Sequence, residues 1–168
     1  MRVTTLVSCV ALVALVALPT KASGQSVANL VGTWRLVSYE SRETAGAVQY
    51  PLGQGVIGQL WYDARGHMSA MLMKPDRPPF ASQDLRRGTD AEIRAAFDGF
   101  IAYFGTYTVD PAKRTVTHHV RGASYPNWVG GDQVRYYKLE GARLVLSTPP
   151  IQIGGRPFET ILVWERVP

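Results

Sequence analysis

Arg135 and Tyr137 are the two residues of this sequence whose types and spacing most favour ligand chemistry. They lie two positions apart in an alternating segment at 133–139, and a β-strand would point both side chains to the same face. If Leu139 pairs with Leu144 across the following turn, that face also carries leucines. An arginine among leucines is costly to bury without a partner. The partner is either a ligand carboxylate or phosphate held by the planar guanidinium or an internal acid, unless Arg135 points outward.

His118 and His119 are the next candidates for chemistry. Adjacent residues of a strand point to opposite faces, so this segment cannot supply a metal site with two histidines. We expect His118 to point inward because it shares a face with Val116 and Val120. An inward histidine is either a hydrogen-bonded core residue or a group that binds ligand or transfers protons. The sequence has no cluster of cysteines and histidines with metal-ligand spacing, and it predicts neither a metal site nor a cofactor.

Aromatic and methionine side chains complete the candidate site. Tyr125 and Trp128 fall in a glycine-bearing loop, where they could contact a ligand at a barrel rim or pack on neighbouring strands. The turn at 63–66 begins with aspartate and ends with glycine, as in a tight hairpin. Its register places Tyr62 and Met68 on one apolar face, which we assign to the interior. We therefore expect these four side chains to contribute to ligand binding, with core packing as the alternative.

Short strands must position these residues. Most segments alternate with period 2 between turn residues, which predicts strands at 32–40, 56–63, 67–73, 105–109, 115–121, 133–139, 144–148 and 157–167. The segments 42–54 and 149–155 are predicted as loops. In the first strand, the alternation places one set of side chains (Trp34, Leu36, Ser38) opposite another (Arg35, Val37, Tyr39). Eight strands joined mostly by short turns favour an all-β antiparallel up-and-down barrel, with room for side chains or one small ligand.

One helix is predicted within this all-β pattern, at 89–103. Thr89 is a typical N-cap, and Glu92 completes a capping box. Apolar residues follow at helical spacing and form one stripe (Ile93, Ala96, Phe97, Phe100, Ile101, Phe104). We expect this amphipathic helix either to close one end of the barrel, as a lid or a plug, or to pack outside the sheet.

Residues 1–24 have the order of a secretory signal: Arg2, an apolar run to Leu18, then small residues. The run is shorter than a membrane span needs, so we expect cleavage after Gly24 or Ala22 rather than an uncleaved anchor. This predicts an exported domain, periplasmic or secreted, at residues 25–168 without a membrane span. Removal of the leader lowers the net charge from +5 to +3. The remaining basic residues form no run, which disfavours nucleic-acid binding; the oligomeric state stays open.

The sequence resembles the calycin group and, within it, the lipocalin-like domain family. The matching segments are LVGTWRLVS (30–38), YPLG (50–53), GHMSA (66–70), RP (77–78), YFGTY (103–107), VTHHV (116–120), PNW (126–128) and RLVLS (143–147). The resemblance implies a small barrel with an internal cavity. It also implies that the tryptophan of the Gly32-x-Trp34 motif stacks with an arginine from the last strand, here Arg166, and seals the barrel base.

The sequence is compatible with three hypotheses of function. The first is an exported barrel that binds a small hydrophobic or amphipathic molecule in its cavity without catalysis. The alternative is a cyclase or isomerase that uses the barrel as a reaction chamber, with His118, Tyr137 and Arg135 as its catalytic residues. The third is a barrel with a filled core that serves only as a stability or interaction module.

Overall fold

The computed structural model describes residues 29–43, 46–153 and 155–168. The predicted leader at 1–24, and with it the predicted cleavage site, lies outside the described residues. Within the described ranges, no helix is long and apolar enough to cross a membrane.

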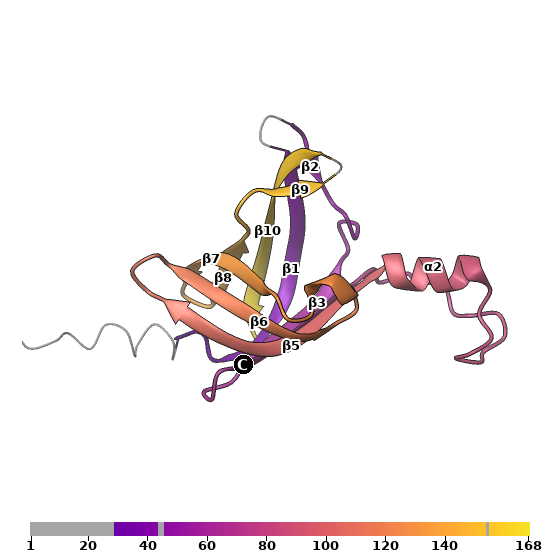
Figure 1. Ribbon diagram of the computed structural model, residues 1–168, viewed down its shortest axis with the longest axis horizontal. Helices are drawn as coiled ribbons and strands as arrows, with labels where there is room; N and C mark the ends of the chain where they lie inside the picture. The colour runs from indigo at the N-terminus through magenta and orange to yellow at the C-terminus, as the bar shows by residue number, and fades with distance from the viewer. Residues whose placement is uncertain (1–28, 44–45, 154) are drawn as a thin grey trace, which may run out of the picture.

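Ten strands of the described chain form one antiparallel sheet that closes on itself (Figure 1). The barrel consists of β1 (Gly32–Glu43), β3 (Ile57–Tyr62), β4 (His67–Met73), β5 (Phe100–Asp110), β6 (Thr115–Ala123), β7 (Asp132–Glu140), β8 (Arg143–Ser147) and β10 (Arg156–Arg166). Each of these strands pairs with the next, and β1 pairs with β10 to close the ring. The predicted eight-stranded up-and-down barrel is confirmed.

Two short strands lie where loops were predicted. β2 (Val48–Gln49) pairs with β1, and β9 (Ile151–Ile153) pairs with β10. Figure 1 shows both at the same end of the molecule, beside the far ends of β1 and β10. The two barrel strands that close the ring are therefore prolonged at that end.

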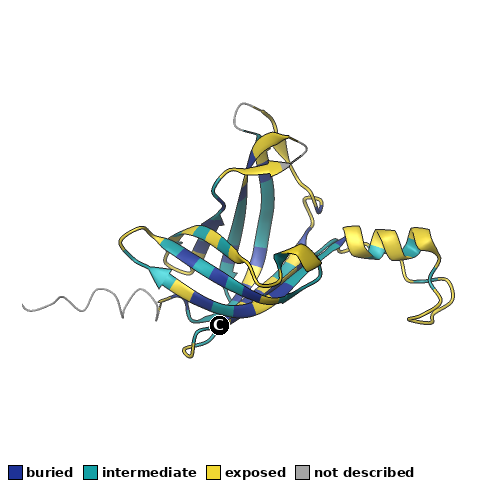
Figure 2. Ribbon diagram, viewed as in Figure 1, coloured by how far each residue is buried: buried dark blue, intermediate teal, exposed yellow. Residues whose placement is uncertain are grey.

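The interior of the barrel follows the period-2 pattern, which Figure 2 shows as alternating buried and more exposed residues along the strands. In the β3–β4 hairpin, Tyr62 pairs with Met68 and Leu60 pairs with Ala70, and all four are buried. Leu139 pairs with Leu144 as predicted. These registers follow from the turns, because a slip of one residue would turn every apolar side chain outward.

The base of the barrel is built around Trp34. This side chain is fully buried, its Nε1 donates to the Leu30 carbonyl at 2.9 Å, and the Arg166 guanidinium stacks over its ring at 4.2 Å. Arg166 also donates to the backbone carbonyls of Val31 and Asn29. The backbone of Gly32 has φ of +139°, and a Cβ there would lie 2.6 Å from the Arg166 guanidinium. Glycine is required because other residues rarely adopt this φ, and the close approach of the arginine adds to that requirement.

The predicted helix is present but much shorter than expected. α2 spans Asp90–Asp98 and begins with the predicted capping box at Thr89 and Glu92. Gly99 ends it, and Phe100 already belongs to β5. The apolar stripe assigned to 89–103 was therefore wrong: its second half alternates as a strand. The pattern misled because the apolar residues at 100–101 and 103–104 have helical spacing, although the segment is a strand with apolar residues on both faces.

The position of α2 also differs from both expectations. None of its residues is buried, and Ile93 and Phe97 are each about half exposed. Figures 1 and 2 show it projecting from the barrel with mostly exposed residues. It is neither a lid nor a plug, and it does not pack on the outside of the sheet.

Candidate functional site

The barrel encloses a cavity of about 330 Å³. Most of its wall is apolar, formed by side chains from β3, β4, β5, β8 and β10 (Leu60, Ala70, Leu72, Ile101, Leu146, Leu162). Trp128, in the short 3₁₀ helix η1 (Pro126–Trp128), and Gln152 of β9 reach the cavity from its rim. A volume of this size accommodates a small organic molecule, so the barrel does not have a filled core.

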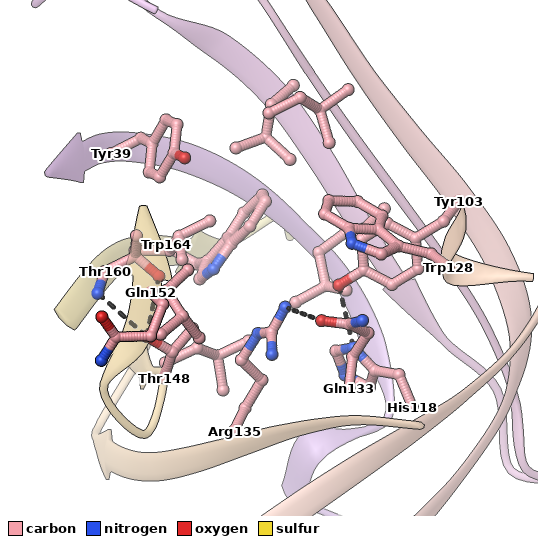
Figure 3. A pocket seen from close by; sticks show the side chains of 17 residues that line it. Tyr39, Tyr103, His118, Trp128, Gln133, Arg135, Thr148, Gln152, Thr160 and Trp164 are labelled. Carbon is pink, nitrogen blue, oxygen red and sulfur yellow. Dashed lines mark hydrogen bonds between the residues drawn. The ribbon is translucent and has the colours of Figure 1, made fainter. Parts of the chain in front are cut away.

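Arg135 of β7 projects into this cavity (Figure 3). Its guanidinium donates to the Val134 carbonyl at 2.8 Å and to the Gln133 side chain at 3.1 Å. Among the described residues, no carboxylate lies within ion-pair distance of Arg135. The alternative that Arg135 pairs with an acidic residue of the protein is therefore excluded for this part of the chain. The leucine face predicted for this strand is present, since Leu144 and Leu146 are buried on the adjoining β8. A partly buried cation without an ion-pair partner in an apolar wall is unfavourable, so a ligand that brings a hydrogen-bond acceptor or a negative charge to it would be stabilised.

His118 of β6 is fully buried at the floor of the cavity, whereas His119 on the other face contacts Asp132 at 2.7 Å. Two tyrosines contact the His118 ring: Tyr62 Oη lies 2.6 Å from Nε2, and Tyr103 Oη lies 2.9 Å from Nδ1. The prediction that His118 points inward is confirmed, and both of its ring nitrogens have protein partners.

Burial holds the pKa of His118 well below its ordinary value of 6.5, and the positive charge of Arg135 lowers it further. Burial likewise raises the pKa of Tyr62 and of Tyr103, while Arg135 opposes both increases. The imidazole and both phenols are therefore neutral at neutral pH. The site contains one fixed positive charge, on Arg135, next to a neutral cluster of hydroxyls and imidazole.

Tyr39 reaches the cavity because of an irregularity in β1. The pairing of β1 with β10 shifts between Leu36 and Ser38, and this bulge reverses the alternation beyond it. Trp34 and Leu36 point inward before the bulge, and Tyr39 lines the cavity after it. The prediction that Tyr39 and Trp34 lie on opposite faces of the strand was wrong, because the extra residue of a bulge interrupts the alternation.

Three aromatic rings pack edge-on against one another at the rim of the cavity. Trp128 packs edge-on against Tyr103, with ring centroids 5.7 Å apart, and Tyr125 packs edge-on against Trp128 at the same distance. Trp128 lines the cavity, whereas Tyr125 lies outside it and is 45% exposed. Tyr125 supports the rim tryptophan through this contact.

The structure thus brings Arg135, His118 and Trp128 together in the lining of the cavity. Tyr62 lies behind His118. Met68 packs within the core and Tyr137 is partly buried against it, and neither lines the cavity. Among the aromatic lining residues, sequence reasoning missed Tyr39, Tyr103 and Trp164. Tyr103 was missed because its segment was assigned to the helix. Gln133 was within reach of the sequence pattern, because it lies two positions before Arg135 on the same strand.

Trp164 of β10 supplies a further polar atom at the cavity. Its side chain is 1% exposed, and its Nε1 has no hydrogen-bond partner among the described residues. A buried indole N–H normally finds a partner. No group of three or more side chains able to hold a metal ion occurs within the described ranges.

Comparison with known proteins agrees with this geometry. A family model described as a lipocalin-like domain matches residues 31–167. The chain is also 37% identical, over 108 residues, to a 4'-hydroxy-3'-methoxypropiophenone carrier protein (ppsC) from Aspergillus oryzae. The aligned region is 60% of this chain and 97% of that relative. The match of the family model to nearly the whole barrel shows that the chain belongs to the lipocalin-like domain family.

Proposed function

We propose that this protein is an exported carrier that binds one small amphipathic molecule inside its barrel. The observation that carries the proposal is the unpaired guanidinium of Arg135 in an otherwise apolar cavity. The leucine-rich wall would contact the apolar part of the ligand, and Arg135 would contact its polar end. This division of the cavity is the reason for expecting an amphipathic ligand rather than a pure hydrocarbon.

The A. oryzae relative supports the chemical class of the ligand. Its name describes a carrier of a single aromatic ring that bears a ketone, a hydroxyl and a methoxy group. A molecule of that kind combines an aromatic body with oxygen atoms at its ends. The cavity of this chain offers aromatic walls at Trp128, Tyr39 and Trp164 together with the Arg135 cation. A small oxygenated aromatic compound is therefore the ligand class that we propose for this protein.

The surroundings of His118 favour a carrier over a cyclase or isomerase. A general base needs a free nitrogen within reach of the proton that it removes. Both nitrogens of His118 have tyrosine partners, and Tyr137 does not line the cavity. Arg135 is the other predicted catalytic residue that lines the cavity, and it cannot act as a base because an arginine is permanently protonated.

Native mass spectrometry of freshly purified protein tests the proposal, together with titration against 4'-hydroxy-3'-methoxypropiophenone. We expect a bound small molecule, recovered with unchanged mass, and saturable binding of the probe. Leu162→Trp should abolish binding by filling the cavity, and Arg135→Gln should weaken it. Arg143→Gln, which removes an exposed arginine from β8, should bind as the unmodified protein does. A protein that carries no ligand and binds no probe would refute the carrier proposal.

Export is tested separately, on the full chain expressed in a bacterial host. The charged, apolar and small-residue order of residues 1–24 supports cleavage by a signal peptidase. We expect the secreted or periplasmic protein to begin at Gln25 or Ser23, as determined by N-terminal sequencing. Recovery of intact chain with Met1 in the cytoplasmic fraction would contradict export.

A further inference from the structure

The cavity has hydrogen-bond donors that no acceptor among the described residues satisfies. The guanidinium of Arg135 has five N–H groups, and its hydrogen bonds to the Val134 carbonyl, the Gln133 side chain and Tyr103 occupy three of them. The Nε1–H of Trp164 has no partner among the described residues. Both side chains line the cavity, and Figure 3 shows them projecting into the same space. Tyr103 lies beside Arg135 in the same cavity, and its hydroxyl can either donate or accept a hydrogen bond.

The fully buried Tyr62 determines which ring nitrogen of His118 carries the proton. The Tyr62 hydroxyl has one hydrogen-bond partner among the described residues, the Nε2 atom of His118 at 2.6 Å. If Nε2 carried the proton, the Tyr62 O–H would be a buried donor without an acceptor, which is unfavourable because the group has lost its hydrogen bonds to water. Tyr62 therefore donates to Nε2, which must be unprotonated.

The tautomer of His118 then fixes the role of Tyr103. A neutral imidazole has one N–H, and with Nε2 unprotonated this N–H is on Nδ1. Nδ1–H donates to the Tyr103 oxygen at 2.9 Å. Arg135, whose charge lowers the pKa of Tyr103 against the increase caused by burial, can also act only as a donor. The Tyr103 oxygen thus accepts from its neighbours, and its own O–H remains free to donate into the cavity.

We propose that the ligand presents to Tyr103, Arg135 and Trp164 an oxygen that can only accept hydrogen bonds, as in a ketone or a carboxylate. This inference rests on the proposed carrier function and specifies its ligand chemistry. The three side chains come from β5, β7 and β10 and line the same cavity. The site disfavours an amine, which would bring further donors to these donors. Tyr62 does not line the cavity. It is a positioning residue: by fixing the tautomer of His118, it leaves the O–H of Tyr103 free to donate to the ligand.

The tautomer is tested first, without any ligand. Nitrogen-15 spectra of the imidazole groups of the folded protein distinguish a protonated from an unprotonated ring nitrogen. We expect His118 to show a protonated Nδ1 and an unprotonated Nε2 at neutral pH. A protonated Nε2 would overturn the inference whatever the protein binds.

The ligand chemistry is tested with four matched probes: propiophenone (a ketone), hydrocinnamate (a carboxylate), propylbenzene (no oxygen) and phenylpropylamine (an amine). We expect the ketone and the carboxylate to bind most tightly and the amine most weakly. Tyr103→Phe should weaken binding of the ketone and the carboxylate about tenfold, the worth of one hydrogen bond from a buried donor, and leave propylbenzene unchanged.

Tyr62→Phe tests the positioning role, with Tyr107→Phe as its matched control. Without Tyr62, the Nε2 of His118 no longer has to accept, so Tyr103 can donate to Nδ1 instead of to the ligand. The preference for ketone over propylbenzene should fall at least about threefold. The Tyr107 ring packs on Tyr62 at 4.6 Å, but its hydroxyl donates to the Asp63 carbonyl outside the cavity. Tyr107→Phe should therefore keep the preference.

The outcomes separate this inference from the carrier proposal. If propylbenzene binds as tightly as the oxygenated probes, the carrier proposal stands and the acceptor inference is overturned. An unchanged preference in Tyr103→Phe would overturn it as well. If no probe binds the unmodified protein and no ligand co-purifies with it, the carrier proposal fails and this inference fails with it.

Discussion

At the base of the barrel, Arg166 contacts Trp34 and the start of the chain at once. Its guanidinium stacks on the indole and donates to the carbonyls of Val31 and Asn29. A planar group with several donors can make all of these contacts together, whereas the ammonium of a lysine cannot. The residue closes the base through its shape as much as through its charge.

We predict that Arg166→Lys lowers the free energy of unfolding by about 1–2 kcal/mol, through loss of the stacking and of one carbonyl contact. Urea denaturation monitored by tryptophan fluorescence measures this change. Arg35→Lys is the matched control: Arg35 pairs with Glu165 near the same end, but the pair is exposed. The control should be close to neutral, and equal losses in both variants would argue against a special role for Arg166.

His118 gives the fold a dependence on pH that can be predicted in sign. In the unfolded chain its imidazole binds a proton as the pH falls through about 6.5, whereas burial keeps the pKa in the folded protein well below that value. The unfolded state therefore binds more protons in this range, and the free energy of unfolding falls as the pH falls. The stability that neutral His118 preserves is fully present above about pH 6.5.

Between about pH 7 and pH 5.5, we expect the free energy of unfolding to decrease by up to about 1.4 kcal/mol per pH unit. Denaturation curves at several pH values measure the slope. His118→Gln should remove most of it, and His119→Gln, which keeps the buried histidine, should retain it. A slope that persists unchanged in His118→Gln would assign the dependence to other groups.

At the scale of elements, α2 is held by local interactions rather than by packing. Thr89 and Glu92 form a reciprocal cap, and Glu92 also accepts from the Ala81 backbone. The helix has nine residues and none of them is buried. A helix of this length is marginal in water without tertiary contacts. Its cap therefore determines much of its stability.

We expect the backbone amides of α2 to exchange with solvent much faster than those in the centre of β5. Hydrogen exchange followed by mass spectrometry compares the two segments. Thr89→Ala should accelerate exchange in α2 while changing the overall unfolding midpoint little, because the barrel does not depend on the helix. A large drop in that midpoint would show that α2 supports the barrel after all.

At the scale of the whole molecule, the pairing of β1 with β10 joins the two ends of the described chain. The register runs from Trp34 opposite Arg166 to Glu43 opposite Phe158. The strands around the ring contribute the walls of the cavity, so the cavity exists only when the ring is closed. Binding and folding are linked for this reason, because the unfolded chain has no cavity to offer a ligand.

We predict that propiophenone at 100 times its dissociation constant raises the free energy of unfolding by about 2.7 kcal/mol. Thermal or urea denaturation with and without the probe measures the increase. Leu162→Trp, with its cavity filled, should show no such increase, while Arg143→Gln should show all of it. Equal stabilisation of Leu162→Trp would place the binding site outside the cavity.

The sequence by itself determined the local features of the protein. Alternation and turn residues predicted the eight strands, the register of the hairpin at 60–70 and the inward direction of His118, because strand periodicity and turn chemistry act over a few residues. The same patterns placed Arg135 on the leucine face of its strand. Periodicity did not predict the end of α2, since the apolar residues after Gly99 keep helical spacing although they form a strand.

Only the tertiary structure decided which residues meet in the cavity. A bulge in β1 turns Tyr39 inward, and that irregularity is specified by pairing with β10 rather than by local sequence. Tyr62, Tyr103 and His118 come from three strands, and their contacts exist because the ring closes. The polarity of the site follows from those long-range hydrogen bonds, which no spacing along the chain can encode.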